Sequence, residues 1–164
     1  MPFQLSISQA DEPRIAIPAI GLQLRVRLPQ YVSGGSVAIV ETTNAPGFGP
    51  PLHRHGETEI FYVTAGRYLF EVDGRQFEVR QGEMVTVPGG CAHGFVNIGD
   101  TPASQLVTIM PGMDALAFFT ELGEAMRAGR PDPAALAAFG QRWGVEFLGP
   151  PLRAPQRPAA RSGA

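Results

Sequence analysis

The sequence contains no lysine, because all 13 of its basic residues are arginines. Without a lysine amine the chain cannot form a Schiff base with a carbonyl substrate or with pyridoxal phosphate. It also cannot build a P-loop, whose lysine binds nucleotide phosphates. The absence of lysine therefore excludes two large classes of enzyme.

Other features that are rare or absent indicate the cellular location of the protein and the partners that it does not bind. Cys91 is the only cysteine, so no disulfide can form within the chain, which is compatible with a reducing compartment. No apolar run approaches the roughly 18 residues of a membrane helix, and the first residues lack the basic and apolar regions of a signal peptide. The net charge of -2 predicts no nucleic-acid surface. We expect a cytoplasmic protein that binds neither membranes nor nucleic acid.

What is present is typical of one globular domain: 164 residues, 44% of them hydrophobic and 17% charged. The end of the chain differs, since it holds three arginines, no acidic residue and four prolines, which predicts a disordered tail. The predicted segments are an N-terminal arm (1–21), a β-barrel (22–112), a helical C-terminal extension (113–148) and this tail (149–164).

Short segments rich in β-branched and aromatic residues recur within 22–110, between glycines, prolines and aspartates. Asp73-Gly74 suits a tight type I′ hairpin. There is no room for the helical crossovers of a parallel sheet, so an antiparallel sandwich or barrel is expected. The predicted strands are Leu22–Leu28, Val37–Thr42, Glu59–Thr64, Tyr68–Val72, Gln76–Val79, Met84–Val87, His93–Ile98 and Gln105–Met110.

The pattern changes after Pro111. Residues 113–129 carry apolar side chains at near-helical spacing, with Gly129 as a candidate stop. Asp132-Pro133 then supplies an N-cap and a first-turn proline for a second short helix. "GVEFLGPPL" follows as a last extended piece.

All three histidines lie in two glycine- and proline-rich motifs. "GFGPPLHRHGETEIFYVTAG" (47–66) fits G-x5-H-x-H-x3-E-x6-G, and "GEMVTVPGGCAHGFVN" (82–97) fits G-x5-P-x-G-x2-H-x3-N. On a strand, His53 and His55 point to the same face. Glu59 opens the next strand, and His93 follows a Pro-Gly-Gly turn. Three imidazoles and one carboxylate that converge would suit one divalent transition metal: Fe, Mn, Ni, Co, Cu or Zn.

With both motifs, the sequence resembles the cupin superfamily. The motif region runs from Gly47 to Asn97, and the strand pattern extends the likeness over about 22–110. The resemblance implies an all-β fold, the cupin-type double-stranded β-helix or jelly-roll barrel, here with a short helical C-terminal extension. It implies a metal in the barrel, with the family's ligands carried over to His53, His55, Glu59 and His93.

Two residues compete with this ligand set. Glu57 is a second carboxylate two residues past His55, and we prefer Glu59. Cys91 could be a thiolate ligand or a redox switch, but a small cysteine often fills apolar space in a turn, and we prefer that role. Asn97 is expected to fix the end of its strand, not to contact substrate.

A substrate pocket is expected around the metal. If Glu59 faces inward, strand alternation brings Phe61 and Val63 to the same side, and His93 brings Phe95. On the neighbouring strand either Met84 and Thr86 or Val85 and Val87 face inward, and Met84 and Thr86 are our choice. So apolar a lumen favours a small, flat organic substrate.

A more diffuse likeness concerns the whole chain. "EIFYVTAGRYLFEVDGRQFEVRQGE" and "IMPGM" followed by "FFTELGE" resemble single-domain bacterial cupins related to quercetin 2,3-dioxygenases. That resemblance implies oxygen-dependent cleavage of an enolic or aromatic compound, with Glu59 as catalytic proton acceptor. The alternatives are a non-redox metal enzyme (polyketide cyclase, isomerase or lyase) and a non-catalytic small-molecule-binding module.

The quaternary structure is expected to be a homodimer. Barrel sheets expose strand edges that invite pairing with other chains. We predict that the N-terminal segment Pro2–Ile20 is a free arm that pairs with the partner's sheet.

Overall fold

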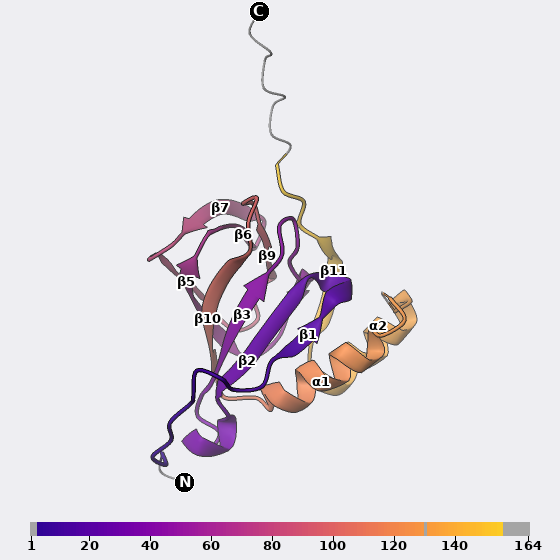
Figure 1. The fold of residues 1–164 in the computed structure, drawn as a ribbon. Coiled ribbons are helices and arrows are strands. Elements are labelled where there is room, and N and C mark those ends of the chain that lie inside the picture. The colour runs from indigo at the N-terminus through magenta and orange to yellow at the C-terminus, as the bar shows by residue number, and fades with distance from the viewer. Residues whose placement is uncertain (1–2, 130, 156–164) are drawn as a thin grey trace, which may run out of the picture.

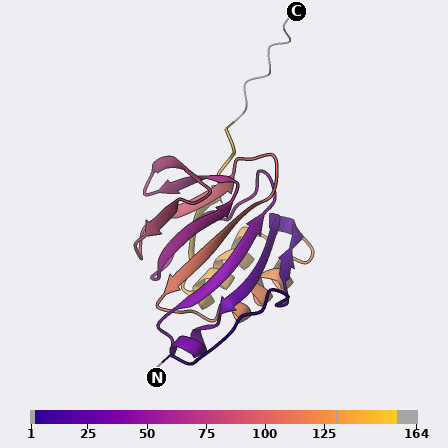
Figure 2. The same cartoon turned by 60° about the vertical axis from the view of Figure 1, so that its left-hand side comes forward.

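A computed structural model describes residues 3–129 and 131–155, which form two antiparallel β-sheets with two helices beside them (Figure 1). The first sheet has the strand order β1-β2-β3-β10-β5-β8, and the second has the order β11-β4-β9-β6-β7. Figure 2 shows how the long, twisted strands of the first sheet cross in front of the helices. The predicted all-β jelly-roll barrel with a helical extension is confirmed.

Eight strands lie close to the predicted segments, whereas two short ones, over residues 15–17 and 51–54, were not among those segments. In the first sheet they are β1 (Ile15–Ile17), β2 (Leu22–Leu28), β3 (Ala38–Asn44), β5 (Thr58–Ala65), β8 (Met84–Val87) and β10 (Ala103–Met110). In the second they are β4 (Pro51–Arg54), β6 (Arg67–Val72), β7 (Arg75–Arg80), β9 (His93–Asn97) and β11 (Glu146–Pro151). Asp73 and Gly74 join β6 to β7 with φ of 46° and 79°, as the predicted hairpin requires.

The main core lies between the two sheets. Along β3 and β10 buried and half-buried residues alternate without interruption, because successive side chains of a strand point to opposite faces. The inward residues of β5 and β6 add aromatic rings, with the centroids of Phe61 and Phe70 5.2 Å apart in an edge-to-face arrangement. Tyr68, Phe70 and Val63 are fully buried here.

The helices α1 (Ala115–Ala125) and α2 (Pro133–Trp143) form a second, smaller core against β1 and β2. Asp132 caps α2 by accepting hydrogen bonds from the N–H groups of Ala134 and Ala135, and Pro133 follows it, as predicted. The helix α1 ends before its expected stop at Gly129. In the helices of the described part of the chain, no segment has both the length and the apolarity needed to cross a membrane.

The N-terminal arm is not free over its whole predicted length of 1–21. β1 pairs with β2 of the same chain, and Ile17 and Ile20 are buried beside α1. Burial of these apolar side chains holds the segment to its own chain, so the prediction of a free arm up to Ile20 was wrong. Residues 3–9 run without regular structure and expose Phe3, Leu5 and Ile7.

The predicted tail (149–164) begins too early. β11 continues to Pro151 and pairs with β4, next to an ion pair in which Arg54 Nη2 lies 2.7 Å from Glu146 Oε2. Backbone pairing with an open strand edge outweighs the proline content of "GPPL" here. Residues 156–164 lie outside the described residues.

Candidate metal centre

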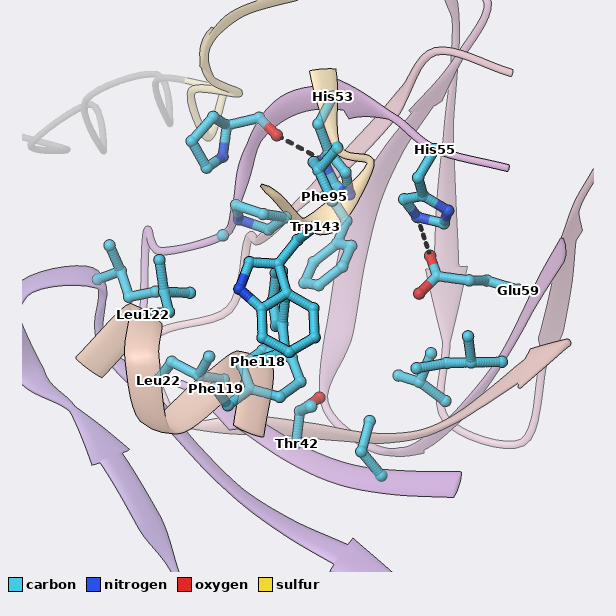
Figure 3. A pocket seen from close by; sticks show the side chains of 18 of the residues that line it. Leu22, Thr42, His53, His55, Glu59, Phe95, Phe118, Phe119, Leu122 and Trp143 are labelled. Carbon is cyan, nitrogen blue, oxygen red and sulfur yellow. Dashed lines mark hydrogen bonds and ion pairs between the residues drawn. The ribbon is translucent and has the colours of Figure 1, made fainter. Parts of the chain in front are cut away.

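Both sheets contribute to the group that the sequence singles out (Figure 3). His53 on β4 faces His93 on β9 in direct register, in the second sheet. His55 follows the end of β4, and Glu59 lies on β5 of the first sheet. One ligand atom from each of these four side chains lies within 4.8 Å of the other three. The structure thus brings the four predicted ligands together.

Backbone carbonyls orient two of the imidazoles. Nδ1 of His53 lies 2.7 Å from the carbonyl oxygen of Pro51, and Nδ1 of His93 lies 3.0 Å from that of Cys91. Because a carbonyl oxygen only accepts hydrogen bonds, each Nδ1 carries the hydrogen. Each Nε2 therefore keeps a lone pair, and metal-binding histidines are commonly fixed in this way.

The Nε2 atom of His93 then lies 3.0 Å from Glu59 Oε2, and that of His55 lies 3.4 Å from the same oxygen. For His93, a lone pair on Nε2 that faces a carboxylate oxygen is favourable only with a cation between them, either a proton or a metal ion. Two atoms each about 2.1 Å from one ion are at most about 4.2 Å apart, so a contraction of about half an ångström brings the set into range. The donor set fits a divalent transition metal.

The protonation states also suit ligands. Burial alone would raise the pKa of Glu59, but hydrogen bonds and charge from His55 and His93 outweigh it and lower that pKa to about 2. Burial and the charge of His93 lower the pKa of His53 to about 4. The site thus holds an ionised carboxylate and a neutral imidazole at neutral pH, the forms that bind metals.

Glu57 occupies a different place from Glu59. Its Oε2 lies 3.1 Å from Nδ1 of His55, without the alignment of a hydrogen bond, and Glu57 is outside the group of four. Burial would lower the pKa of His55, but the hydrogen bond and charge of Glu59, together with the charge of Glu57, raise it above its ordinary value. Glu57 therefore approaches Nδ1 of His55, and Glu59 approaches Nε2 of the same ring.

The other residues of the motifs have structural contacts. Cys91 packs against the main core and is outside the group of four, while its carbonyl holds His93. Asn97 is buried and donates to the carbonyls of Asn44 and Thr101, which fixes the end of β9 as expected.

A cavity of about 140 Å³ is lined by three of the four side chains, those of His53, His55 and Glu59. Phe61 and Phe95 line it, as predicted, whereas Val63 is buried in the core beyond its lining. Met84 and Thr86 point outward, and Met84 is 62% exposed. The choice of these two was wrong, because β8 buries its valines, Val85 and Val87, in the main core.

The family comparison agrees with the geometry. A family model described as "Cupin domain" matches residues 40–109, which include all four side chains of the centre. An uncharacterized protein of Methanocaldococcus jannaschii is 31% identical over 84 residues, which are 51% of this chain and 67% of that one. The chain belongs to the cupin superfamily.

Two other curated relatives of this cupin carry functional names. An oxalate-binding protein of Thermotoga maritima is 32% identical over 66 residues, covering 40% of this chain and 54% of that one. A gentisate 1,2-dioxygenase of Haloferax sp. is 29% identical over 105 residues, covering 60% and 29%. The chain thus spans about half the length of the first of these and less than a third of the second.

Solved structures share the fold at low identity. KdgF from Halomonas sp. superposes with a TM-score of 0.61 at 18% identity, over 69% of this chain and 99% of that one. The polyketide cyclase RemF from Streptomyces resistomycificus gives 0.57 at 22%, over 66% and 80%. These likenesses concern the fold.

One wall of the cavity was not foreseen and lies outside the cupin match. It comes from the helical extension and the neighbouring strands, with aromatic rings from Phe118, Phe119, Trp143 and Phe147. Figure 3 shows Trp143 across the cavity between Phe95 and the α1 side chains. The near-helical apolar spacing of 113–129 was a signal for a helix, but it did not say which cavity the helix would cover.

Proposed function

We propose that this cupin binds one divalent transition metal ion through His53, His55, Glu59 and His93 and is a dioxygenase of small aromatic or enolic compounds, similar to quercetinases. The observation that carries the proposal is the position of this group at one end of an almost wholly apolar cavity. Such a cavity binds a flat organic molecule and excludes water from the reacting end.

The bound ion would be one of Fe, Mn, Ni, Co, Cu or Zn. When bound, it supplies a Lewis acid and, if redox-active, a path for electrons between substrate and oxygen. The three imidazoles and the carboxylate suit any of these ions.

Glu59 has a second role in this proposal. Its carboxylate is ionised and buried in the lining of the apolar cavity, so it can accept the proton of a substrate hydroxyl that approaches the centre. Phe61 and Phe95 provide ring faces against which a flat molecule packs. The chain itself thereby binds, orients and deprotonates the substrate.

The relatives support this proposal to different degrees. The likeness to a gentisate 1,2-dioxygenase favours oxygen chemistry. The likeness to an oxalate-binding protein fits less well, because none of the described residues that line the cavity is an arginine and the sequence has no lysine. A small dianion would find neither a lysine nor an arginine there.

The same cavity also suits the non-redox alternative, a cyclase, isomerase or lyase in which the metal is only a Lewis acid. The fold likeness to the polyketide cyclase RemF is consistent with this candidate. A third candidate is a binding module without turnover, because helices α1 and α2 enclose the cavity and could retain a ligand.

Oxygen uptake tests the proposal. Protein loaded with each metal in turn is incubated in air with flavonols, catechols and diketones, and an oxygen electrode follows consumption. Uptake that depends on both metal and substrate supports a dioxygenase. Turnover by the zinc form without oxygen would instead identify the non-redox enzyme, and a compound bound tightly but recovered unchanged would identify the binding module.

A further inference from the structure

Three strands of the first sheet present their inward side chains in rows. Register pairs each inward residue of β10 with one on β3 and one on β5. From the metal centre inward, the rows are Ala38–Ile109–Glu59, Val40–Val107–Phe61 and Thr42–Gln105–Val63. A charged row and a polar row are thus separated by an apolar one.

The polar row contains buried groups without partners. Thr42 is 5% exposed and Gln105 is fully buried. Within the described residues, neither the Thr42 hydroxyl nor either amide atom of Gln105 has a hydrogen-bond partner. A buried polar group without a partner destabilises a fold, so its presence needs an explanation.

Thr42 lines the same cavity as Glu59, and Figure 3 shows its hydroxyl pointing toward the rings of Phe118 and Trp143. The next inward residue of β3, Asn44, also lines the cavity, but its Oδ1 already accepts a hydrogen bond from the Tyr68 hydroxyl. Thr42 is thus a residue of the cavity lining whose buried hydroxyl has no partner within the described residues.

The spacing defines the size of that molecule. Four residues along β5 separate the row of Glu59 from the row of Thr42, which is about 13 Å at the rise of a strand. The side chains between them, Phe61, Val107 and Val40, are apolar and line the cavity.

We propose that Thr42 is a specificity-determining residue that hydrogen-bonds a hydroxyl or carbonyl group at the far end of an elongated, otherwise apolar substrate. Gln105, its direct cross-strand neighbour, is the other unpartnered polar residue of this row, but it does not line the cavity. The inference rests on the proposed function, since it places the other end of the substrate at the metal centre. It narrows the substrate class to molecules that carry a polar group at each end.

The first test compares two probes that differ at the far end only. These are 3-hydroxyflavone and its 4′-hydroxy derivative, titrated without oxygen into metal-loaded protein and followed by flavonol fluorescence. The wild-type protein should bind the 4′-hydroxy compound about tenfold more tightly, which is the value of one well-placed hydrogen bond. Thr42→Val keeps the shape but removes the hydroxyl, and should bring the ratio of the two Kd values close to one.

Matched variants separate recognition from packing. Thr42→Ser keeps the hydroxyl and should retain the preference, and so should Gln105→Met, which changes the neighbouring polar residue that does not line the cavity. Metal content should stay unchanged in all three, because none of these residues is a ligand. Thr42→Val should also raise the Tm of the free protein by about 3 °C, because it removes an unpartnered buried hydroxyl.

The proposal is overturned if wild type shows no preference or binds neither probe, if Thr42→Val keeps the preference, or if that variant lowers the Tm. Because binding is measured without oxygen, a lost preference in Thr42→Val supports the polar subsite even where oxygen uptake is absent. An unchanged preference with intact oxygen uptake removes the subsite and leaves the proposed dioxygenase standing.

Discussion

Glu59 Oε2 is the atom on which the centre depends most, since the Nε2 atoms of His55 and His93 both approach it. The imidazoles keep this carboxyl ionised against the opposing effect of burial. In the proposed function the ligand and the proton acceptor are the same group, and the two roles separate only through substitutions that preserve its size.

The four ligands should therefore respond differently to replacement. His53→Ala, His55→Ala or His93→Ala opens a coordination position and should remove most of the bound metal. Glu59→Gln keeps the size and one carbonyl oxygen but removes the charge, so some metal should remain while turnover falls about 10²–10⁴-fold. Elemental analysis and steady-state rates measure the two effects.

Glu57→Gln is the matched control, since it changes the neighbouring carboxylate, which is outside the group of four. It should keep both metal and turnover. The assignment of the carboxylate ligand is wrong if Glu57→Gln removes the metal and Glu59→Gln does not.

For individual residues, the sequence was informative where the spacing of a motif and the metal-binding chemistry of its side chains point to the same site. Three histidines and a glutamate in two motifs predicted a group that the fold does bring together. The inward face of β8 was not predictable, because "MVTV" offers Met84 and Thr86 or two valines, and both faces read as moderately apolar. Burial of the valines in the core decides the register, and that depends on the opposing sheet.

The turn before β9 sets the position of His93. Gly89 has no positive φ, but a Cβ there would collide with the backbone carbonyl of Gly56 in the turn that follows β4. The two turns that flank the centre thus approach each other closely, and the Gly89 N–H also donates to the Thr58 hydroxyl.

Gly89→Ala should push the two turns apart, lower the Tm by several degrees and weaken metal binding. The reason is that backbone, and not a flexible side chain, stands in the way of the added methyl group. Gly56→Ala is the control, because a Cβ at Gly56 meets nothing within 4 Å and its φ is not positive. Thermal unfolding and metal titration of the pair test this, and equal effects in both variants would contradict it.

Elements were predictable from the sequence where the pattern is local. Eight strands, the Asp73-Gly74 hairpin and the cap of α2 follow from alternation, turn residues and Asp132-Pro133. β1 was missed because three residues give no measurable alternation. "GVEFLGPPL" was expected to be extended, but the pairing of β11 with β4 was not predicted, because the partner edge exists only in the folded molecule.

At the scale of the whole molecule, the candidate metal centre draws its residues from both sheets. His53 and His93 belong to the second sheet, and Glu59 belongs to the first. An ion that binds only the native state stabilises it by mass action, by about 2.7 kcal/mol at a hundredfold excess over Kd.

Removal of metal by a chelator should therefore lower the Tm by about 5–10 °C, and re-addition should restore it. The melting curve is followed by circular dichroism alongside elemental analysis. His93→Ala, which should not bind metal, should show no response to either treatment. An unchanged wild-type curve with demonstrated loss of metal would count against a centre shared by both sheets.

The exposed N-terminal segment bears on assembly. Phe3, Leu5 and Ile7 alternate along residues 3–7 and are 62%, 97% and 74% exposed, so the segment can present one apolar face to a partner. We expect a homodimer in which this part of the arm covers the partner's sheet.

Light scattering at micromolar concentration should give the mass of a dimer. The double variant Leu5→Ser and Ile7→Ser should shift it toward the monomer, whereas Leu116→Ser, at an exposed site on α1, should not. A strictly monomeric wild-type mass rules the prediction out.

The order of strands in the second sheet has a consequence for folding while the protein is being synthesised on the ribosome. β4, which carries His53, lies between β9 and β11, and its contact residue Arg54 is 92 residues away from Glu146. At about 5–20 residues per second, synthesis of that interval takes about 5 to 18 s. During this time His53 and His55 lie beside an edge of β4 that has no partner, because β11 has not yet been synthesised.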